Sequence, residues 1–381
     1  MGQAGFVRGK ALLAAPSGAA QDSTRPANDR TAPSAYPFRI GERQGDDGLI
    51  TVDALNSFCK LVGELGGDSA SLIAEAGLPP TRELVSGDKV SLRGVGNLLE
   101  ICAKRLNCPD FGLRLAEKQI GCSVMKPLER LLLHARTLEQ AMRCSVDHMA
   151  AYSSGIRQTL LPVPGRAMHR LRFEILLDDY YVFPQLIEQL TLLTHRTTQE
   201  LTGGFAKARA ISFSHTQLGN KWDYARRFSM PISFDQDFDE VLFADSDLRS
   251  NVVEYDENIF STEYAKISIA FPPTPLDTKA RVSQAIRATL ADSACGREEV
   301  CSIIGVSSRT LHRQLARIGT NFERLRDEVR RNLCLRYLAR TDLTITQVAG
   351  RLGFSEGSVL THACQKWFSK SPRELRRDLL R

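Results

Sequence analysis

The last hundred residues of this chain repeat one short pattern, and this repeat constrains the fold more than any other feature. Val300-Cys301-x-x-x-Gly305-Val306-Ser307 returns 48 residues later as Val348-Ala349-x-x-x-Gly353-Phe354-Ser355. In each copy, a small residue allows two helices to cross closely, a glycine suits a turn with positive φ, and a serine can cap the next helix. The pattern predicts a helix, a tight turn and a second helix, twice over.

In the first copy, the second helix is expected to run from about Ser308 to Ile318, with Leu311 and Leu315 facing inward. The candidates for contact with a DNA groove are Ser308, Arg309, His312 and Arg313. An arginine can donate two hydrogen bonds to guanine, and a helix-turn-helix presents the start of its second helix to base edges. The alternative is that these side chains contact phosphates only, or are ordinary solvated surface.

In the second copy, the second helix is expected from Ser355 to about Phe368, with Val359, Leu360, Ala363 and Trp367 toward the core. Its candidates for DNA contact are Gly357, Ser358, Thr361, His362 and Lys366. Gly357 weakens the helix and contributes no side chain. His362 and Cys364 are interpreted as structural rather than metal-binding, because one pair on one helix lacks the further ligands that a zinc site needs.

The segment Phe322–Ala339 is predicted to form one long helix between the two units, with its apolar residues near one face. Two units braced by such a helix would address neighbouring major-groove segments, which lie about 34 Å apart on one side of the duplex.

Charge and proline content divide the chain. Residues 277–381 carry 20 Lys and Arg against 11 Asp and Glu, a net +9, whereas residues 46–276 carry 24 against 30, a net −6. Three prolines in residues 271–276 cannot continue a helix. We therefore predict a disordered tail (1–45), a sensing and dimerisation domain (46–270), a Pro-rich linker (271–276) and a DNA-binding domain (277–381).

The region before the linker is predicted to be an α+β domain, followed by an all-α domain. Helical periodicity is found in 52–65, 69–76, 92–106, 127–133, 138–151, 183–201 and 257–270. Strands are expected at 157–161 and 168–176, which form a hairpin, and at 208–214, 231–234 and 240–243. The apolar stripe of 183–201 fits either the core or a subunit interface.

Several classes of function find no support in the sequence. There is no apolar run of about 18 residues, and the first 15 residues make a poor secretory signal. Nine cysteines without a C-x-x-C pair indicate buried thiols in a reducing cytoplasm, not disulfides or a zinc site. No nucleophile elbow, phosphate-binding loop or H-E-x-x-H motif is present. We expect no catalytic residues, no cofactor and no metal.

Residues from about Arg281 to Arg377 resemble the DNA-binding domain of the AraC/XylS family. The motifs are residues 305–313, 319–322, Ile345-x-x-Val348-Ala349-x-x-Leu352-Gly353-Phe354-Ser355 and Lys366-Trp367-Phe368-x-x-Ser371-Pro372-x-x-Leu375-Arg376. The resemblance implies base-reading positions at Arg309, His312, Arg313, Gly357, Ser358, Thr361 and His362. The second unit departs from the family: Leu360 and Cys364 stand where Phe is usual, His362 where Arg is usual and Leu375 where Tyr is usual.

The preceding domain is similar to that of the subgroup with ornithine-utilisation and virulence regulators. The shared elements are Met125-x-x-Leu128-x-x-Leu131-Leu132 and Tyr224-x-x-x-Phe228-x-x-Pro231-Ile232-x-Phe234. The resemblance implies a cytoplasmic, nucleoid-associated regulator that binds promoter DNA, RNA polymerase and a small effector, and pairs as a homodimer. The sequence identifies no effector-binding residue and does not separate activation from repression. The alternative is an architectural DNA-binding protein whose first domain mediates protein association.

Overall fold

The computed structural model describes residues 48–80, 83–163, 165–177, 183–273, 278–290, 296–339 and 342–379. The predicted tail (1–45) and residues 274–276 of the predicted linker lie outside the described residues. Buried apolar side chains form two hydrophobic clusters, one from Ile50 to Ile267 and one from Val282 to Leu375. The first belongs to an α+β part and the second to an all-helical part, so the predicted fold class is confirmed. The exact domain boundaries stay a prediction.

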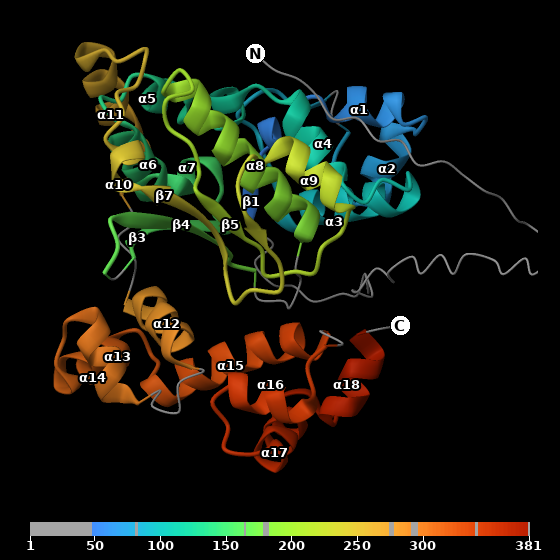
Figure 1. Ribbon diagram of the computed structural model, residues 1–381, viewed down its shortest axis with the longest axis vertical. Coiled ribbons are helices and arrows are strands. Elements are labelled where there is room, and N and C mark those ends of the chain that lie inside the picture. The colour runs from blue at the N-terminus through green and yellow to red at the C-terminus, as the bar shows by residue number, and fades with distance from the viewer. Residues whose placement is uncertain are drawn as a thin grey trace, which may run out of the picture. The chain divides into compact units, whose positions relative to one another are not determined.

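The first part is mainly helical (Figure 1). Its α-helices are α1 (Phe58–Glu64), α2 (Ser69–Glu75), α3 (Leu92–Arg105), α4 (Phe111–Lys118), α5 (Glu129–Leu133), α6 (Leu138–Asp147), α7 (Met149–Tyr152), α8 (Pro184–Leu201), α9 (Lys221–Arg227), α10 (Asp245–Leu248) and α11 (Glu257–Ala270). Within the described residues, a 3-10 turn at Val52–Leu55 precedes α1, and another at Gly121–Val124 lies between α4 and α5.

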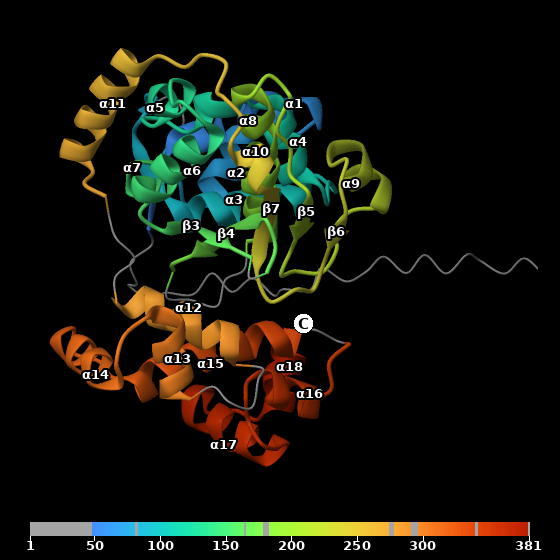
Figure 2. The same cartoon turned by 60° about the vertical axis from the view of Figure 1, so that its left-hand side comes forward.

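A five-stranded sheet with the order β3-β4-β7-β5-β6 supports these helices. Its strands are β3 (Ile156–Pro162), β4 (Met168–Ile175), β5 (Ala210–Ser212), β6 (Ile232–Ser233) and β7 (Asp239–Ala244). β5 and β6 are parallel and the other neighbours are antiparallel, and the predicted hairpin is β3–β4. Helices α6 and α7 contact β3, α8 contacts β7, and these helices gather on one side of the sheet (Figure 2). A separate small pair joins β1 (Leu49–Thr51) to β2 (Lys89–Ser91).

Helix α8 is the centre of the first core. Most of its side chains are buried, including polar ones, so the predicted stripe belongs to the core and not to a subunit interface. Two of its buried amide groups donate hydrogen bonds: Gln185 Nε2 donates to the carbonyl oxygen of Pro109 at 2.7 Å, and Gln189 Nε2 donates to that of Ala54 at 2.8 Å. These bonds offset the cost of burying amide groups.

The sequence did not predict α4, and Gly112 explains why. Glycine disfavours a helix, yet a Cβ at Gly112 would lie 2.0 Å from the carbonyl oxygen of Gln185. The missing side chain allows α4 to approach α8 closely, and the Gly112 N–H donates to Gln185 Oε1 at 2.7 Å. The packing between the two helices therefore outweighs the local propensity.

Two predicted helices are interrupted. Ser57 has a left-handed backbone (φ 66°), which divides the predicted helix 52–65 into a 3-10 turn and α1. His148, with ψ of 22°, lies outside helical geometry and separates α6 from α7 in the predicted helix 138–151. Its Nδ1 lies 2.9 Å from the carbonyl oxygen of Phe271.

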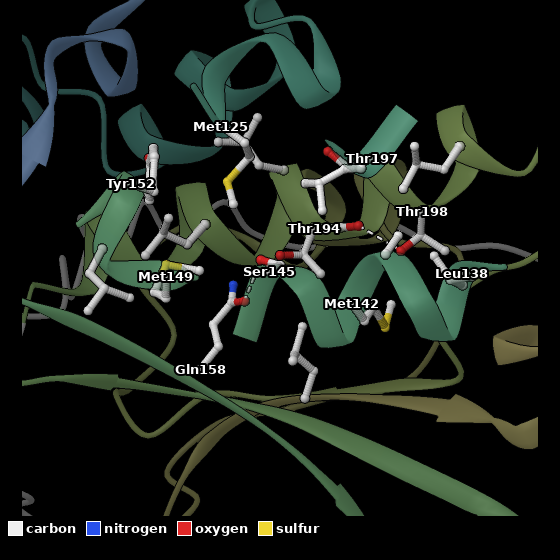
Figure 3. A pocket seen from close by; sticks show the side chains of 17 residues that line it. Met125, Leu138, Met142, Ser145, Met149, Tyr152, Gln158, Thr194, Thr197 and Thr198 are labelled. Carbon is white, nitrogen blue, oxygen red and sulfur yellow. Dashed lines mark hydrogen bonds between the residues drawn. The ribbon is translucent and has the colours of Figure 1, made fainter. Parts of the chain in front are cut away.

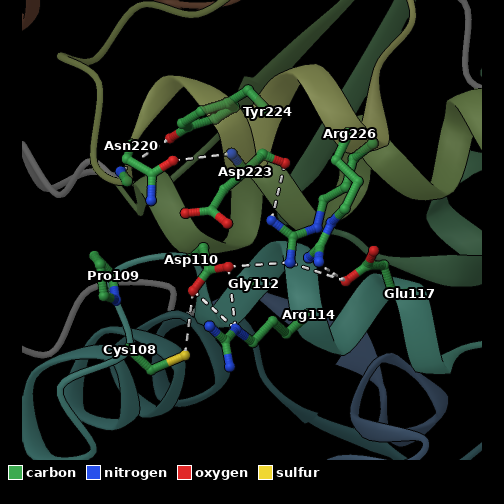
Figure 4. A network of polar contacts seen from close by, with 12 residues as sticks. Cys108, Pro109, Asp110, Gly112, Arg114, Glu117, Asn220, Asp223, Tyr224 and Arg226 are labelled. Atoms are coloured by element: carbon green, nitrogen blue, oxygen red, sulfur yellow. Dashed lines mark hydrogen bonds and ion pairs between the residues drawn. The ribbon is translucent and has the colours of Figure 1, made fainter.

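A polar network fixes α9, which the sequence also did not predict, against α4 (Figure 4). The Arg227 guanidinium pairs with Asp110 at 3.0 Å and with Glu117 at 2.9 Å. Burial acts to raise the pKa of Asp110, but Arg114 and Arg227 outweigh burial and hold this pKa below its usual range. The hydroxyl of Tyr224 donates to the buried Glu188 of α8. The segment Tyr224–Phe228 is therefore a structural anchor.

The second part consists of seven helices within the described residues. They are α12 (Thr278–Thr289), α13 (Arg297–Ile304), α14 (Ser308–Arg317), α15 (Phe322–Ala339), α16 (Ile345–Arg351), α17 (Gly357–Phe368) and α18 (Pro372–Leu379). Helices α13 and α14 form one helix-turn-helix unit, α16 and α17 form the other, and α15 joins them (Figure 1).

Candidate nucleic-acid interface

The first unit has the predicted turn. Gly305 ends α13 with φ of 70°, a conformation that favours glycine, and Ser307 Oγ accepts the N–H of Thr310 at 3.2 Å. Leu311 and Leu315 are buried. These two leucines fix which side of α14 faces solvent.

The residues of α14 predicted to contact DNA bases lie on this solvent-facing side. Arg309, His312 and Arg313 are exposed, and Ser308 is half-buried. Among the described residues, neither Arg309 nor Arg313 forms an ion pair within the chain. Both guanidinium groups are therefore available for an external acceptor, such as guanine or phosphate.

Other basic residues of this part have structural roles, which the sequence did not reveal. Arg330 of α15 donates to the carbonyl oxygens of Leu352 at 2.8 Å and Gly353 at 2.7 Å. Arg281 of α12 donates to the carbonyl oxygen of Ile304 at 2.8 Å. Each arginine satisfies carbonyls at the end of a helix, where no intrahelical donor remains. The basic charge of this part is thus only partly available to DNA.

The second unit keeps the turn but changes the start of its second helix. Gly353 has φ of 66°, as predicted. The expected cap at Ser355 is wrong: α17 begins at Gly357, its N-cap is Glu356, and no side chain caps it. The hydroxyl of Ser358 instead donates to Glu356 Oε1 at 2.6 Å. An acidic side chain therefore stands at the end of α17 that a DNA-reading helix presents to bases.

The remaining predicted residues of α17 are placed as expected, apart from one core position. Ser358, Thr361, His362 and Lys366 are exposed, and Gly357 is half-buried. Thr361 Oγ1 donates to the carbonyl oxygen of Gly357 at 2.9 Å, and Lys366 Nζ lies 3.4 Å from Asp327 Oδ2. The expected core residue Val359 is 38% exposed.

Cys364 takes the interior position in α17. It is buried, and its Sγ lies 3.5 Å from that of Cys334 in α15. Since His362 is exposed while Cys364 faces this interior, the pair does not converge on one ion. This placement agrees with a structural role for Cys364 and leaves His362 on the solvent-facing side of α17.

Helix α15 has 18 residues and is therefore about 27 Å long. It packs against α12, α16 and α18. Its buried residues include Phe322 and Leu325 near the first unit and Leu338 near the second. One continuous helix thus carries core residues of both units, as the sequence predicted.

Comparison with known proteins agrees with both parts. The arabinose-binding domain of AraC transcription regulator, N-terminal, matches residues 66–252, and a helix-turn-helix domain matches residues 300–378. The chain belongs to the AraC family of transcription regulators. No helix in the described ranges has the length and apolar character to cross a bilayer.

Similarity to individual relatives of this AraC-family regulator extends over different parts of the chain. The HTH-type transcriptional regulator VirS of Mycobacterium tuberculosis is 29% identical over 334 residues, which cover 86% of this chain and 96% of VirS. The ornithine utilization regulator of Pseudomonas aeruginosa is 35% identical over 79 residues, 21% of this chain and 23% of that protein. The crystal structure of the transcriptional regulator CdpR from P. aeruginosa covers 81% of this chain and 96% of its own, with 19% identity and a TM-score of 0.38.

Proposed function

We propose that this regulator binds specific promoter sites through unequal contributions of its two helix-turn-helix units. The first unit reads bases with Arg309, Arg313 and His312. The second unit contacts mainly the phosphate backbone, through His362 and Lys366. The observation that carries this proposal is that Arg309 and Arg313 of α14 are exposed and form no ion pair with another described residue. By contrast, α17 has Glu356 as its N-cap and contains no arginine.

The first domain supplies the regulatory input in this proposal. An effector regulates transcription only if its affinity differs between a DNA-binding and a non-binding state. We infer that the first domain binds a small effector and pairs two copies of the chain in the cytoplasm. The DNA-bound dimer then acts on RNA polymerase. The resemblance of residues 66–252 to an arabinose-binding domain supports an effector-binding role.

The first experiment is selection of preferred DNA sites by the full chain from a random oligonucleotide pool. A regulator is expected to prefer its selected site over random DNA by several decades. A ratio below about tenfold would instead support the architectural alternative. Affinity is expected to fall steeply with salt, because each neutralised phosphate releases counterions.

The second experiment separates base reading from phosphate contact. Arg313→Ala is expected to cost about 1–3 kcal/mol on the selected site and to relax the preference at one base pair. The matched control is Arg226→Ala, which removes the same charge from the exposed end of α9 in the first domain. Equal losses for Arg313→Ala on the selected site and on random DNA would refute a base-reading role.

A further inference from the structure

A cavity in the first domain lies between α6, α8 and the sheet (Figure 3). Its empty volume is about 640 Å³, counting the part that opens to solvent. All the lining residues belong to the first domain, so the site is formed without the DNA-binding helices.

The lining of the cavity is mainly apolar, and it is uncharged. Figure 3 shows the 17 residues that form it, and none is Lys, Arg, Asp, Glu or His. Half of the six methionines of the chain, Met125, Met142 and Met149, are among them. Methionine side chains are flexible and polarizable, and they adapt to apolar ligands of irregular shape.

Polar groups are few and sit at defined places. Ser145 of α6 donates to Gln158 Oε1 of β3 at 2.9 Å. The Nε2 hydrogens of Gln158 have no partner among the described residues, although the residue is only 7% exposed. On α8, Thr198 Oγ1 donates to the carbonyl oxygen of Thr194 at 2.9 Å. Tyr152, Thr194 and Thr197 add hydroxyl groups to the lining, and Gln158 supplies its one amide donor, while the remaining lining side chains are mostly apolar.

We propose that this cavity is the effector site and that its ligand is a neutral, mainly aliphatic molecule with one carbonyl or hydroxyl oxygen that accepts a hydrogen bond from Gln158 Nε2. The role of the ligand as an effector rests on the proposed function, whereas binding of the ligand to the cavity does not. A sugar, with a hydroxyl on nearly every carbon, would place several hydroxyls against the eleven apolar side chains of this lining. A carboxylate or an amino acid would bury a charge without a counter-charge.

The test is calorimetric binding to the full chain of three probes: 2-decanone, decanoate and arabinose. We expect 2-decanone to bind at least about tenfold more tightly than decanoate, which has the same number of carbons but is charged, and arabinose not to bind. Equal or tighter binding of decanoate or arabinose would overturn the proposal.

Two variants place the ligand in this cavity. Ala141→Phe adds a ring at a buried position that lines the cavity and should abolish binding of 2-decanone. Its control is Ala150→Phe, the same change at an exposed position on α7, which should leave binding unchanged. Gln158→Leu keeps the approximate volume but removes the donor, and it should weaken 2-decanone at least about threefold while decanoate stays weak. Unchanged binding in both cavity variants would overturn the assignment.

Calorimetry without DNA measures ligand binding independently of DNA binding. If 2-decanone binds as expected, the cavity accepts the predicted class of ligand. If the affinity for the selected DNA site is then unchanged by 2-decanone, the role of the cavity as effector site is overturned. If 2-decanone changes the affinity for the selected site in a gel shift, and Ala141→Phe abolishes that change, the full proposal is supported. Failure to bind any DNA would refute the proposed function without altering the calorimetric result.

Discussion

The two turn glycines of the repeat offer a matched pair of substitutions, because they share a backbone conformation but not their surroundings. Gly305 has φ of 70° and Gly353 has φ of 66°. An alanine in this left-handed conformation costs about 1–2 kcal/mol. A Cβ at Gly305 would meet nothing within 4 Å, whereas one at Gly353 would lie 2.6 Å from the carbonyl oxygen of Leu290. The neighbouring backbone must shift in the second case only.

This difference sets the expected magnitudes. Gly305→Ala should cost about 1–2 kcal/mol, the conformational cost alone. Gly353→Ala should cost about 2–5 kcal/mol, because crowding of a packed region adds about 1–3 kcal/mol. For a domain of this size, each kcal/mol lowers Tm by about 4–8 °C. The Tm of Gly353→Ala should therefore lie at least about 4 °C below that of Gly305→Ala.

Fluorescence can report this difference from the DNA-binding domain alone. The chain has two tryptophans. Trp222 of the first domain is 83% exposed, whereas Trp367 packs against Phe354 and Phe368 with ring centroids about 6 Å away (6.1 and 6.0 Å). Both glycine variants are made in a Trp222→Phe background, so that thermal unfolding is followed at Trp367. Equal Tm values for the two variants, or a lower one for Gly305→Ala, would refute the reasoning.

Three further predictions concern helix ends and the buried acid. Ser307→Ala should cost about 1 kcal/mol of stability through loss of a cap, whereas Ser355→Ala should be neutral in the same fluorescence assay. Gly357→Ala should keep or slightly raise Tm, since its Cβ meets nothing within 4 Å. Burial holds the pKa of Glu188 well above its usual range, so stability should fall as pH rises above the unfolded pKa. Glu188→Gln should flatten that fall in Tm-against-pH curves; identical slopes would contradict this explanation.

Local patterns in the sequence were sufficient for much of this fold. The repeat predicted both helix-turn-helix units, and apolar periodicity predicted α3, α8 and α11 nearly to their ends. The alternating residues of the β3–β4 hairpin were also recognised. In each case the apolar periodicity that identifies the helix or strand lies within the residues of that helix or strand.

The errors arose where a distant contact overrides the local pattern. Gly112 appears unfavourable for a helix until the carbonyl of Gln185 is placed against it. Ser57 looks like an ordinary helix residue, but its hydroxyl donates to the carbonyl oxygen of Lys118 and its backbone is left-handed. The cavity was not foreseen for the same reason, since Ser145 and Gln158 lie on a helix and a strand that meet only in the folded domain.

The second unit shows why a repeated fold pattern does not ensure an equal DNA contact. The turn requires only a residue that tolerates positive φ, and Gly353 meets that requirement as Gly305 does. The packing requires an inward-facing residue, and Leu360 or Cys364 supplies it. Neither requirement restricts the outward side chains, which alone meet the DNA. An acidic Glu356 at the start of α17 is therefore compatible with the fold while opposing the phosphates that the basic first unit attracts. Specificity in this protein should consequently follow the α14 half of its site.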